Sequence, residues 1–160
     1  MPKLQDLMSA DDMGKLLNVS SPRHYVAGAT ICLRGDPCPW FALIIKGAVR
    51  LASTGSEGLT LTTAVLRPGQ CIDPSGGLIN LPAINDIFAE ETCELAVVPH
   101  QQMDHLLLQN PDIARAIMTL DKLRIRSLSA MLDDIRRLPR KVQVAKFVLV
   151  RLQAMQDDHA

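Results

Sequence analysis

The sequence has few aromatic residues, no net charge and no long hydrophobic run. Aromatic residues make up 3% of the 160 residues, too few for a surface that stacks on nucleic-acid bases or for an aromatic cage. Seventeen Lys and Arg balance seventeen Asp and Glu, so the chain lacks the overall basic excess of a nucleic-acid binder. We therefore expect that this chain does not bind DNA by itself.

The hydrophobic runs are too short or too interrupted for a membrane helix. The longest, residues 41–45 and 142–152, fall short of the roughly 20 residues that a bilayer requires. The first residues, 1–13, contain no apolar core of a signal peptide. We expect a cytoplasmic protein with no membrane partner.

The cysteines form no CxxC pair and no Cys/His cluster at zinc spacing. We interpret Cys32, Cys38, Cys71 and Cys93 as reduced, buried, small hydrophobic residues. A metal or redox site is the less favoured alternative. The sequence thus predicts no metal site.

The first two thirds of the chain predict a mainly β domain with short flanking helices. Ser9, followed by Asp11 and Asp12, is typical of a helix N-terminus, and this helix should end near Asn18. Short apolar runs then alternate with Gly and Pro turn signals, as in an antiparallel sandwich or barrel. The runs that we expect to form strands are 30–33, 41–45, 49–52, 59–66 and 95–98.

A long helix is predicted from residue 112 to residue 138. Asn110, Pro111 and Asp112 supply an N-cap, a proline at the first helical position and an acid in the first turn. Pro139 should end or kink the helix, whose length would be roughly 40 Å at about 1.5 Å per residue. A shorter helical pattern precedes it around Met103, and an amphipathic helix follows over 142–155.

Two apolar stripes run along the long helix. The first, Ile113, Ile117, Leu120 and Leu123, should lie on the β domain. The second follows a seven-residue repeat and predicts a parallel homodimer, because no other helix is long enough to cover it. Packing of both stripes inside one chain is the alternative. The predicted dimerisation residues are Met118, Asp121, Ile125, Leu128, Leu132 and Ile135, with Asp121 as a polar residue in the seam.

The order of these motifs resembles the cyclic-nucleotide-binding fold of the Crp/Fnr family of transcription regulators. The resemblance rests on a glycine framework, on the segment before the long helix, and on that helix itself, and it covers nearly the whole chain. The matching segments are Gly28, Gly35, Ile45-Lys46-Gly47-Ala48-Val49, Leu66-Arg67-Pro68-Gly69, Cys93-Glu94-Leu95-Ala96-Val97 and Asn110-Pro111-Asp112.

This resemblance implies an antiparallel β-roll, or jelly-roll, followed by a long dimerisation helix. Residues 1–109 would form the effector-sensing roll with its short flanking helices, and 110–138 the dimerisation helix. Residues 139–160 would be the hinge and the first helix of a helix-turn-helix domain, and DNA would bind through that C-terminal domain, which is absent from this chain. A stand-alone sensor, cyclic-nucleotide-like or gas-sensing, without DNA binding is the alternative.

The effector segment departs from the best-known family members. Their cassette carries Gly-Glu-Leu and, later, Arg-Ser-Ala, and here no Lys or Arg occurs from Pro68 to Ala114. A buried phosphate needs a bidentate cation or a nest of backbone amides, so cyclic AMP and cyclic GMP are not expected in the usual pose. The effector remains unknown. The candidate effector-binding residues that the resemblance implies are Asp73, Ser75, Gly76, Gly77, Leu78, Asn85, Arg124, Leu128 and Ser129.

A haem sensor and an enzyme are two further, less favoured alternatives. Haem-sensing relatives take ligands from the same loop and, in one kind, from an N-terminal proline; Pro2 and Cys71 fit this pattern, but Pro74 stands where a histidine is wanted. His24, His100 and His105 read as a strand residue and two surface helix residues. An enzyme is disfavoured because the sequence has no nucleophile elbow and no phosphate loop.

Overall fold

The computed structural model describes residues 2–55, 60–72, 79 and 81–157. The chain divides into two compact units, one up to residue 122 and one from residue 123 onward. In the first unit, a short 3-10 helix, η1 (Leu4–Asp6), precedes helix α1 (Ala10–Asn18). The Ser9 hydroxyl accepts a hydrogen bond from the Asp12 amide at 3.1 Å, which confirms the predicted N-cap.

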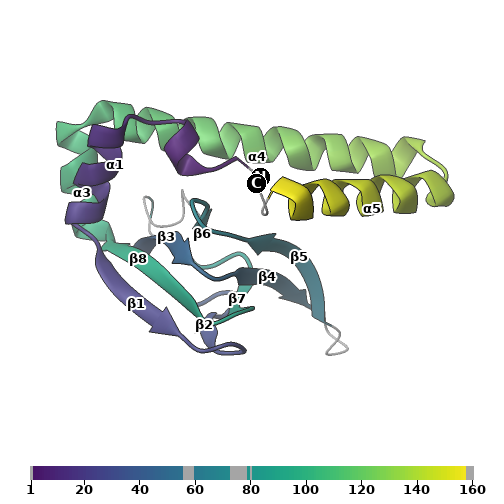
Figure 1. Cartoon of the computed structure of the whole chain (residues 1–160), viewed down its shortest axis with the longest axis horizontal. Coiled ribbons are helices and arrows are strands. Elements are labelled where there is room, and N and C mark those ends of the chain that lie inside the picture. Colours follow the sequence, from purple (N-terminus) through teal and green to yellow (C-terminus); the bar gives the residue numbers. More distant parts are fainter. Residues whose placement is uncertain (1, 56–59, 73–78, 80, 158–160) are drawn as a thin grey trace. The chain divides into compact units, whose positions relative to one another are not determined.

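Within the described residues, eight strands form two four-stranded sheets in which every paired neighbour is antiparallel, as the β-roll prediction requires (Figure 1). The first sheet has the order β1-β8-β3-β6 and the second the order β2-β7-β4-β5. Over the described residues, each predicted run overlaps a strand. The strands are β1 (Ser21–Tyr25), β2 (Thr30–Cys32), β3 (Trp40–Lys46), β4 (Val49–Thr54), β5 (Thr60–Leu66), β6 (Cys71–Ile72), β7 (Asp86–Ala89) and β8 (Cys93–Pro99).

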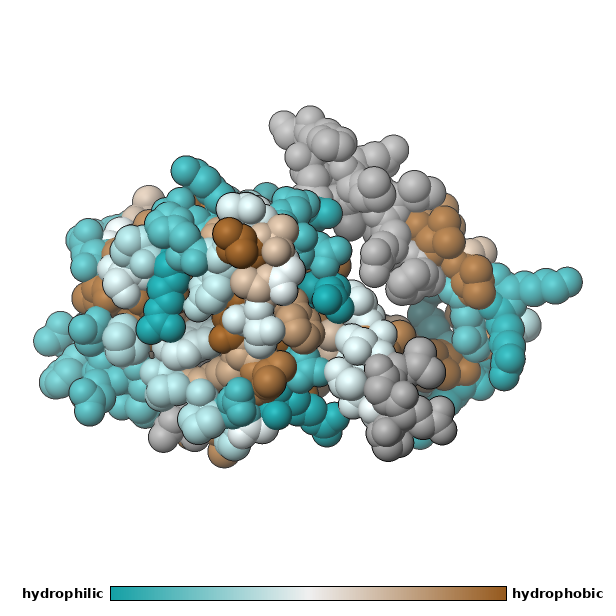
Figure 2. All heavy atoms as spheres, turned by 90° about the horizontal axis from the view of Figure 1, so that it is seen from below, coloured by the Kyte–Doolittle hydropathy of each residue, from teal (hydrophilic) through white to brown (hydrophobic). Residues whose placement is uncertain are grey.

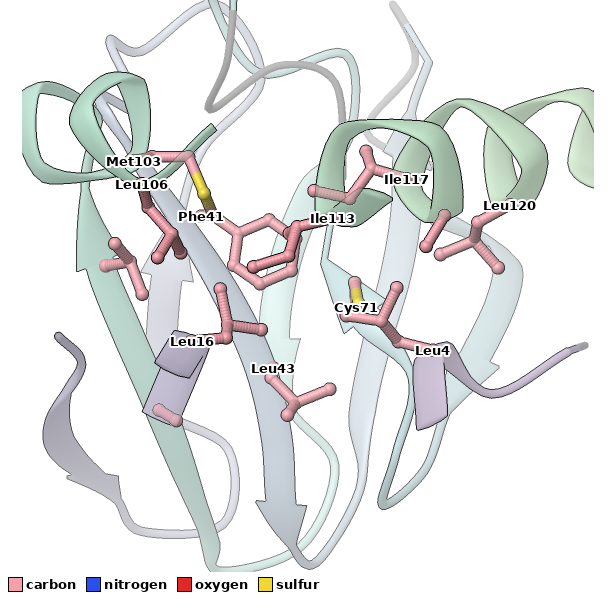
Figure 3. Close-up of a cluster of buried hydrophobic side chains, with 13 residues drawn as sticks. Leu4, Leu16, Phe41, Leu43, Cys71, Met103, Leu106, Ile113, Ile117 and Leu120 are labelled. Carbon is pink, nitrogen blue, oxygen red and sulfur yellow. The ribbon is translucent and has the colours of Figure 1, made fainter. Parts of the chain in front are cut away.

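The central strand β3 is apolar on both faces because both faces are covered. Ala42 and Ile44 belong to one core cluster, together with residues of the second sheet such as Ile87. Phe41 and Leu43 belong to the other cluster, together with residues of the helices (Figure 3). A strand covered on both faces reads as a continuous apolar run rather than an alternating one, which explains the run 41–45.

In the described part of the chain the roll is followed by helices α3 (His100–Gln109), α4 (Pro111–Arg137) and α5 (Arg140–Asp157). The long helix therefore lies where the sequence predicts it. In the first unit, Ile113, Ile117 and Leu120 of α4 are fully buried in the cluster that contains Phe41. At about 25 cal/mol per Å² of apolar surface, the burial of each such side chain contributes roughly 1.5–3 kcal/mol to the free energy of folding.

The second stripe of α4 is exposed. Met118 retains 70% of its accessible surface and Leu132 60%, and Ile125, Leu128 and Ile135 are also exposed. Asp121 is half-buried. The helix thus presents the predicted seven-residue repeat on an apolar face that the described part of the chain leaves open to solvent.

The cysteines depart in part from the sequence expectation. Cys71 and Cys93 are free and buried, as expected, and burial raises the pKa of the Cys93 thiol. Cys32 and Cys38, however, bring their sulfur atoms close together across a separation of six residues. This pairing departs from the expectation of four separate cysteines, and it arises because the turn after β2 returns the chain to itself before β3 begins.

Candidate effector site

The segment that leads into the predicted effector loop is held firmly to the roll. The Gly69 amide donates to the Ile44 carbonyl at 2.9 Å, and the Gly69 carbonyl accepts from the Leu4 amide at 2.8 Å. Gly69 has a φ of 84°, a conformation that favours glycine. Strand β6 then pairs with β3, so that the Cα partner of Cys71 is Leu43. The loop therefore starts from a fixed point on the roll and beside η1.

The segment that follows the loop is fixed by the turn between β2 and β3. The Gly35 amide donates to the Ala83 carbonyl at 2.8 Å, and the Ala83 amide donates to the Asp36 carbonyl at 2.9 Å. An isolated bridge also joins Pro37 to Pro82. The turn between β2 and β3 therefore fixes the chain where it leaves the predicted effector loop.

Asp86 connects three elements through one nearly buried carboxylate, whose residue is 8% exposed. Oδ1 accepts from the Arg34 amide at 3.0 Å, and Oδ2 accepts from the Thr54 hydroxyl at 2.7 Å. The hydrogen bond from the Arg34 amide, followed by that from Thr54, holds the pKa of Asp86 below its ordinary value. The carboxylate therefore stays ionised and ties β7 to β4 and to the β2–β3 turn.

Arg34 is a residue that sequence reasoning missed. Its positive charge also lowers the pKa of Asp86, so a cation lies near the end of the loop even though none occurs between residues 68 and 114. Its side chain is exposed. No local signal could have found it, because Arg34 and Asp86 are 52 residues apart in the sequence.

The structure describes the predicted effector residues only in part. Asp73, Ser75, Gly76, Gly77 and Leu78 lie outside the described residues. Asn85 is half-buried in the first unit, and its Oδ1 lies 3.5 Å from the Thr63 hydroxyl. Arg124, Leu128 and Ser129 lie on α4 in the second unit, where Arg124 is half-buried and the other two are exposed. The composition of the effector site remains a prediction.

The candidate haem and metal ligands are dispersed among elements. His24 lies exposed on β1, and Cys71 is fully buried on β6. His100 is half-buried at the start of α3, where its Nε2 lies 3.5 Å from Asp104 Oδ2, and His105 is exposed. Within the described residues, no group of three His, Cys, Asp or Glu side chains is placed to hold a metal ion. Nor does any helix found there have the length and apolarity to cross a membrane.

The second unit contains a groove of about 530 Å³ between α4 and α5. Its walls include the apolar side chains of Ala130, Met131, Ile135 and Val144. The polar groups at its rim are already engaged, since Gln143 donates to carbonyls of α4 and Lys146 pairs with Asp134. The groove is therefore the contact zone of a helical hairpin.

Comparison with known proteins agrees with the β-roll fold. Residues 22–110 match the model of the cyclic nucleotide-binding domain family. The global nitrogen regulator of Synechococcus elongatus is 26% identical over 133 residues, which cover 79% of this chain and 58% of that protein. The chain thus spans less than two thirds of that relative.

Solved structures show the same fold. The catabolite activator protein of Thermus thermophilus matches with a TM-score of 0.75 and 25% identity, over 83% of this chain and 62% of that one. The c-di-GMP responsive global regulator CLP of Xanthomonas campestris matches with a TM-score of 0.76 and 17% identity, over 88% of this chain and 70% of that one. Two of these relatives are named as regulators and one as an activator protein.

Proposed function

Because the chain belongs to the family of cyclic nucleotide-binding domains, we propose that it is the sensor and dimerisation portion of a Crp/Fnr-type transcription regulator. In this proposal residues 1–109 sense an effector, 110–138 dimerise, and 139–160 open a DNA-binding domain. The likeness in fold to regulators of gene expression supports it. The observation that carries it is the exposed seven-residue repeat along α4.

The dimer follows from the spacing of the exposed residues. Met118, Ile125 and Leu132 recur every seven residues, and Asp121, Leu128 and Ile135 alternate with them, as at the a and d positions of a coiled coil. Large apolar side chains that are 52–70% exposed in one row are costly in water. A second copy of α4, packed in parallel, would bury them in pairs.

A charge substitution tests the dimer. We expect the unmodified chain to sediment as a dimer at micromolar concentration, and Ile125→Asp with Leu132→Asp to give a monomer, because two carboxylates cannot be buried in an apolar seam. Thr119→Asp with Arg126→Gln is the matched control, because it lowers the net charge by the same two units and both residues are exposed, are also seven residues apart and lie one position off the stripe. A monomeric unmodified chain, or equal dissociation of both variants, would contradict the proposal.

The effector is proposed to bind without the family's usual phosphate contact. Between residues 68 and 114 the sequence offers seven acids and no Lys or Arg, and Arg34 already lies close to Asp86. An anion placed there would meet acids without a matched cation. Coupling to α4 would act as a population shift, driven by the effector's differential affinity for the two states of the helix.

Calorimetric titration with cyclic AMP and cyclic GMP tests this chemistry. We expect no binding with a dissociation constant below about 0.1 mM, which corresponds to roughly −5.5 kcal/mol. A micromolar constant would contradict the charge argument. Arg34→Gln, Arg124→Gln and Arg126→Gln, each titrated in turn, would then identify the phosphate partner by the loss of affinity.

A further inference from the structure

Two sulfur atoms meet in the β-roll at the turn between β2 and β3. Cys32 is the last residue of β2, Cys38 lies two residues before β3, and their sulfur atoms are adjacent. The other two cysteines of the sequence, Cys71 and Cys93, are buried and are not joined to any other cysteine. We call Cys32 and Cys38 the thiol pair.

The backbone on both sides of the turn brings the thiol pair together. The pairing of β2 with β7 shifts register just before Cys32, and a bulge of this kind re-aims a side chain. Pro37 and Pro39 restrict the backbone on either side of Cys38. Gly35 has a φ of 89°, which lets the chain reverse between the two cysteines. The meeting of the sulfur atoms is therefore built into the turn.

The residues that the thiol pair encloses hold the exit segment of the predicted effector loop, residues 82–86. The contacts are those of the Arg34 amide with Asp86, of the Gly35 amide and the Asp36 carbonyl with Ala83, and of Pro37 with Pro82. A bond between the two sulfur atoms closes a ring around these contacts and reduces the conformational freedom of the turn. The state of the thiol pair therefore affects how firmly the exit segment is held.

The two redox forms of the thiol pair require different turns. The Cα atoms of the pair are 7.2 Å apart, whereas bridged cysteines usually lie roughly 4.4–6.8 Å apart. A disulfide draws the two ends of the turn toward each other, and a dithiol sets no such limit. The turn thus has a tighter disulfide form and a looser dithiol form.

The thiol pair lies just beneath the surface of the roll. Cys32 is 7% exposed and Cys38 is 5% exposed, while all five residues between them are exposed. Figure 2 shows one face of the molecule, on which hydrophilic and apolar side chains mix over the roll. Local opening of an exposed turn admits a small oxidant more readily than opening of the core around Cys71, which is fully buried.

We propose that the thiol pair is a reversible oxidation site that sets how firmly the effector loop is anchored at its exit. This inference rests on the proposed function, because a transcription regulator works inside the cell. Disulfides are rare there, and those that form are usually transient and serve catalysis or redox sensing. A thiol pair beside a sensing loop matches the second of these uses.

Hydrogen peroxide is the oxidant of the proposed reaction. The thiolate of one cysteine attacks a peroxide oxygen, the O–O bond breaks, and the products are a sulfenic acid and hydroxide, which takes up the thiol proton to give water. The other thiol attacks the sulfenic sulfur, the S–O bond breaks, and a second water leaves as the disulfide forms. The pair loses two electrons and peroxide gains them. Two exchanges with reduced glutathione restore the dithiol and leave oxidised glutathione.

Cysteine mapping of the full chain tests the site. The chain is reduced with millimolar glutathione, treated with micromolar hydrogen peroxide, alkylated in denaturant and mapped by mass spectrometry. We expect a link between Cys32 and Cys38 while Cys71 and Cys93 remain thiols, and full reversal by glutathione. Oxidation of Cys71 or Cys93 at the same rate, oxidation to sulfinic acid without a link, or a link that glutathione does not reduce would overturn the proposal.

Hydrogen exchange tests the consequence for the loop. The amides of residues 82–86 should exchange at least about threefold more slowly in the oxidised chain than in the reduced chain, because the ring restrains the turn. Cys38→Ser should exchange at one rate with or without peroxide. Cys93→Ser, the same substitution in the same core cluster, is the matched control and should keep the peroxide effect. Equal exchange in the two redox forms of the unmodified chain would contradict the proposal, even if a variant failed to fold.

Trp40 provides an optical readout of the same turn. It is the only tryptophan of the sequence, its amide donates to the Cys38 carbonyl at 2.8 Å, and its side chain packs against the cluster that contains the thiol pair. A nearby disulfide accepts an electron from the excited indole, so oxidation should lower the fluorescence and glutathione should restore it. A signal that does not respond, or that responds equally in Cys38→Ser, would contradict the inference. None of these outcomes decides the proposed function, which stands or falls on the sedimentation of the α4 variants.

Discussion

Asp86 holds three parts of the β-roll together through a single carboxylate. It accepts one hydrogen bond from the turn before β3 and one from the end of β4, and the residue itself begins β7. A carboxylate with two donors and little contact with water is most stable in its ionised form. The residue is therefore a structural support of the candidate site, whatever the effector is.

The stability that Asp86 provides should depend on pH. Its pKa is depressed in the folded state, so its contribution is fully present above the ordinary carboxyl pKa near 3.8 and is lost as the pH falls through the folded-state value. We expect the Asp86→Asn variant to have a lower melting temperature than the unmodified chain at pH 7. The difference in melting temperature should disappear below about pH 4. Thermal melts across that range measure it, with exposed Asp133→Asn as control. A difference in melting temperature that grows as the pH falls would contradict this account.

Gly47 occupies a position that no other residue fits. Its φ is 74°, and an added Cβ would lie 2.3 Å from the Thr92 carbonyl oxygen. We expect Gly47→Ala to destabilise the roll by more than the roughly 1–2 kcal/mol of a left-handed alanine, because the neighbouring backbone must also move. Gly28→Ala measures the cost of the left-handed conformation alone, since Gly28 has a φ of 82° and no atom lies within 4 Å of an added Cβ. Equal midpoints in denaturant for the two variants would refute the steric argument.

At the scale of elements, α4 has two apolar stripes that differ in exposure. Ile117 is fully buried against the roll, whereas its neighbour Met118 is 70% exposed. We expect Ile117→Ala to cost roughly 2–5 kcal/mol of folding stability at any protein concentration. Met118→Ala should lower the melting temperature only at concentrations where the chain self-associates. Thermal denaturation at two protein concentrations distinguishes the two variants. If neither effect depended on protein concentration, the assignment of Met118 to a self-association surface would be contradicted.

The edge strand β1 illustrates what hydrophobic pattern does not reveal. It pairs with β8 along its whole length, yet its residues are almost all exposed and include Pro22. An edge strand tolerates proline and polar side chains because only one of its sides must donate and accept hydrogen bonds. His24 is predicted as a strand residue, but no predicted run covers β6 or β7. Strand β6 has only two residues and lies between the turn signals Pro68-Gly69 and Pro74.

For the whole molecule, the core ends before the long helix does. Both core clusters consist of residues up to Leu120, and the first compact unit ends at Lys122. We expect a chain that ends at Lys122 to unfold cooperatively, within a few degrees of the full chain at low concentration. At higher concentration the full chain should gain stability through association, and the shortened chain should not. Loss of cooperative melting on shortening would show that the second unit supports the roll.

The sequence alone determined the features that depend on neighbours along the chain. Ser9 and Asp12 predicted the start of α1, Asn110 and Pro111 the start of α4, and the turn signals the antiparallel roll, because caps, turns and periodicity act over a few residues. Only the tertiary structure decided which groups meet across long separations. It paired Arg34 with Asp86, which are 52 residues apart, and strand β1 with strand β8. Such contacts depend on how the sheets and helices pack, and no local pattern in the sequence encodes them.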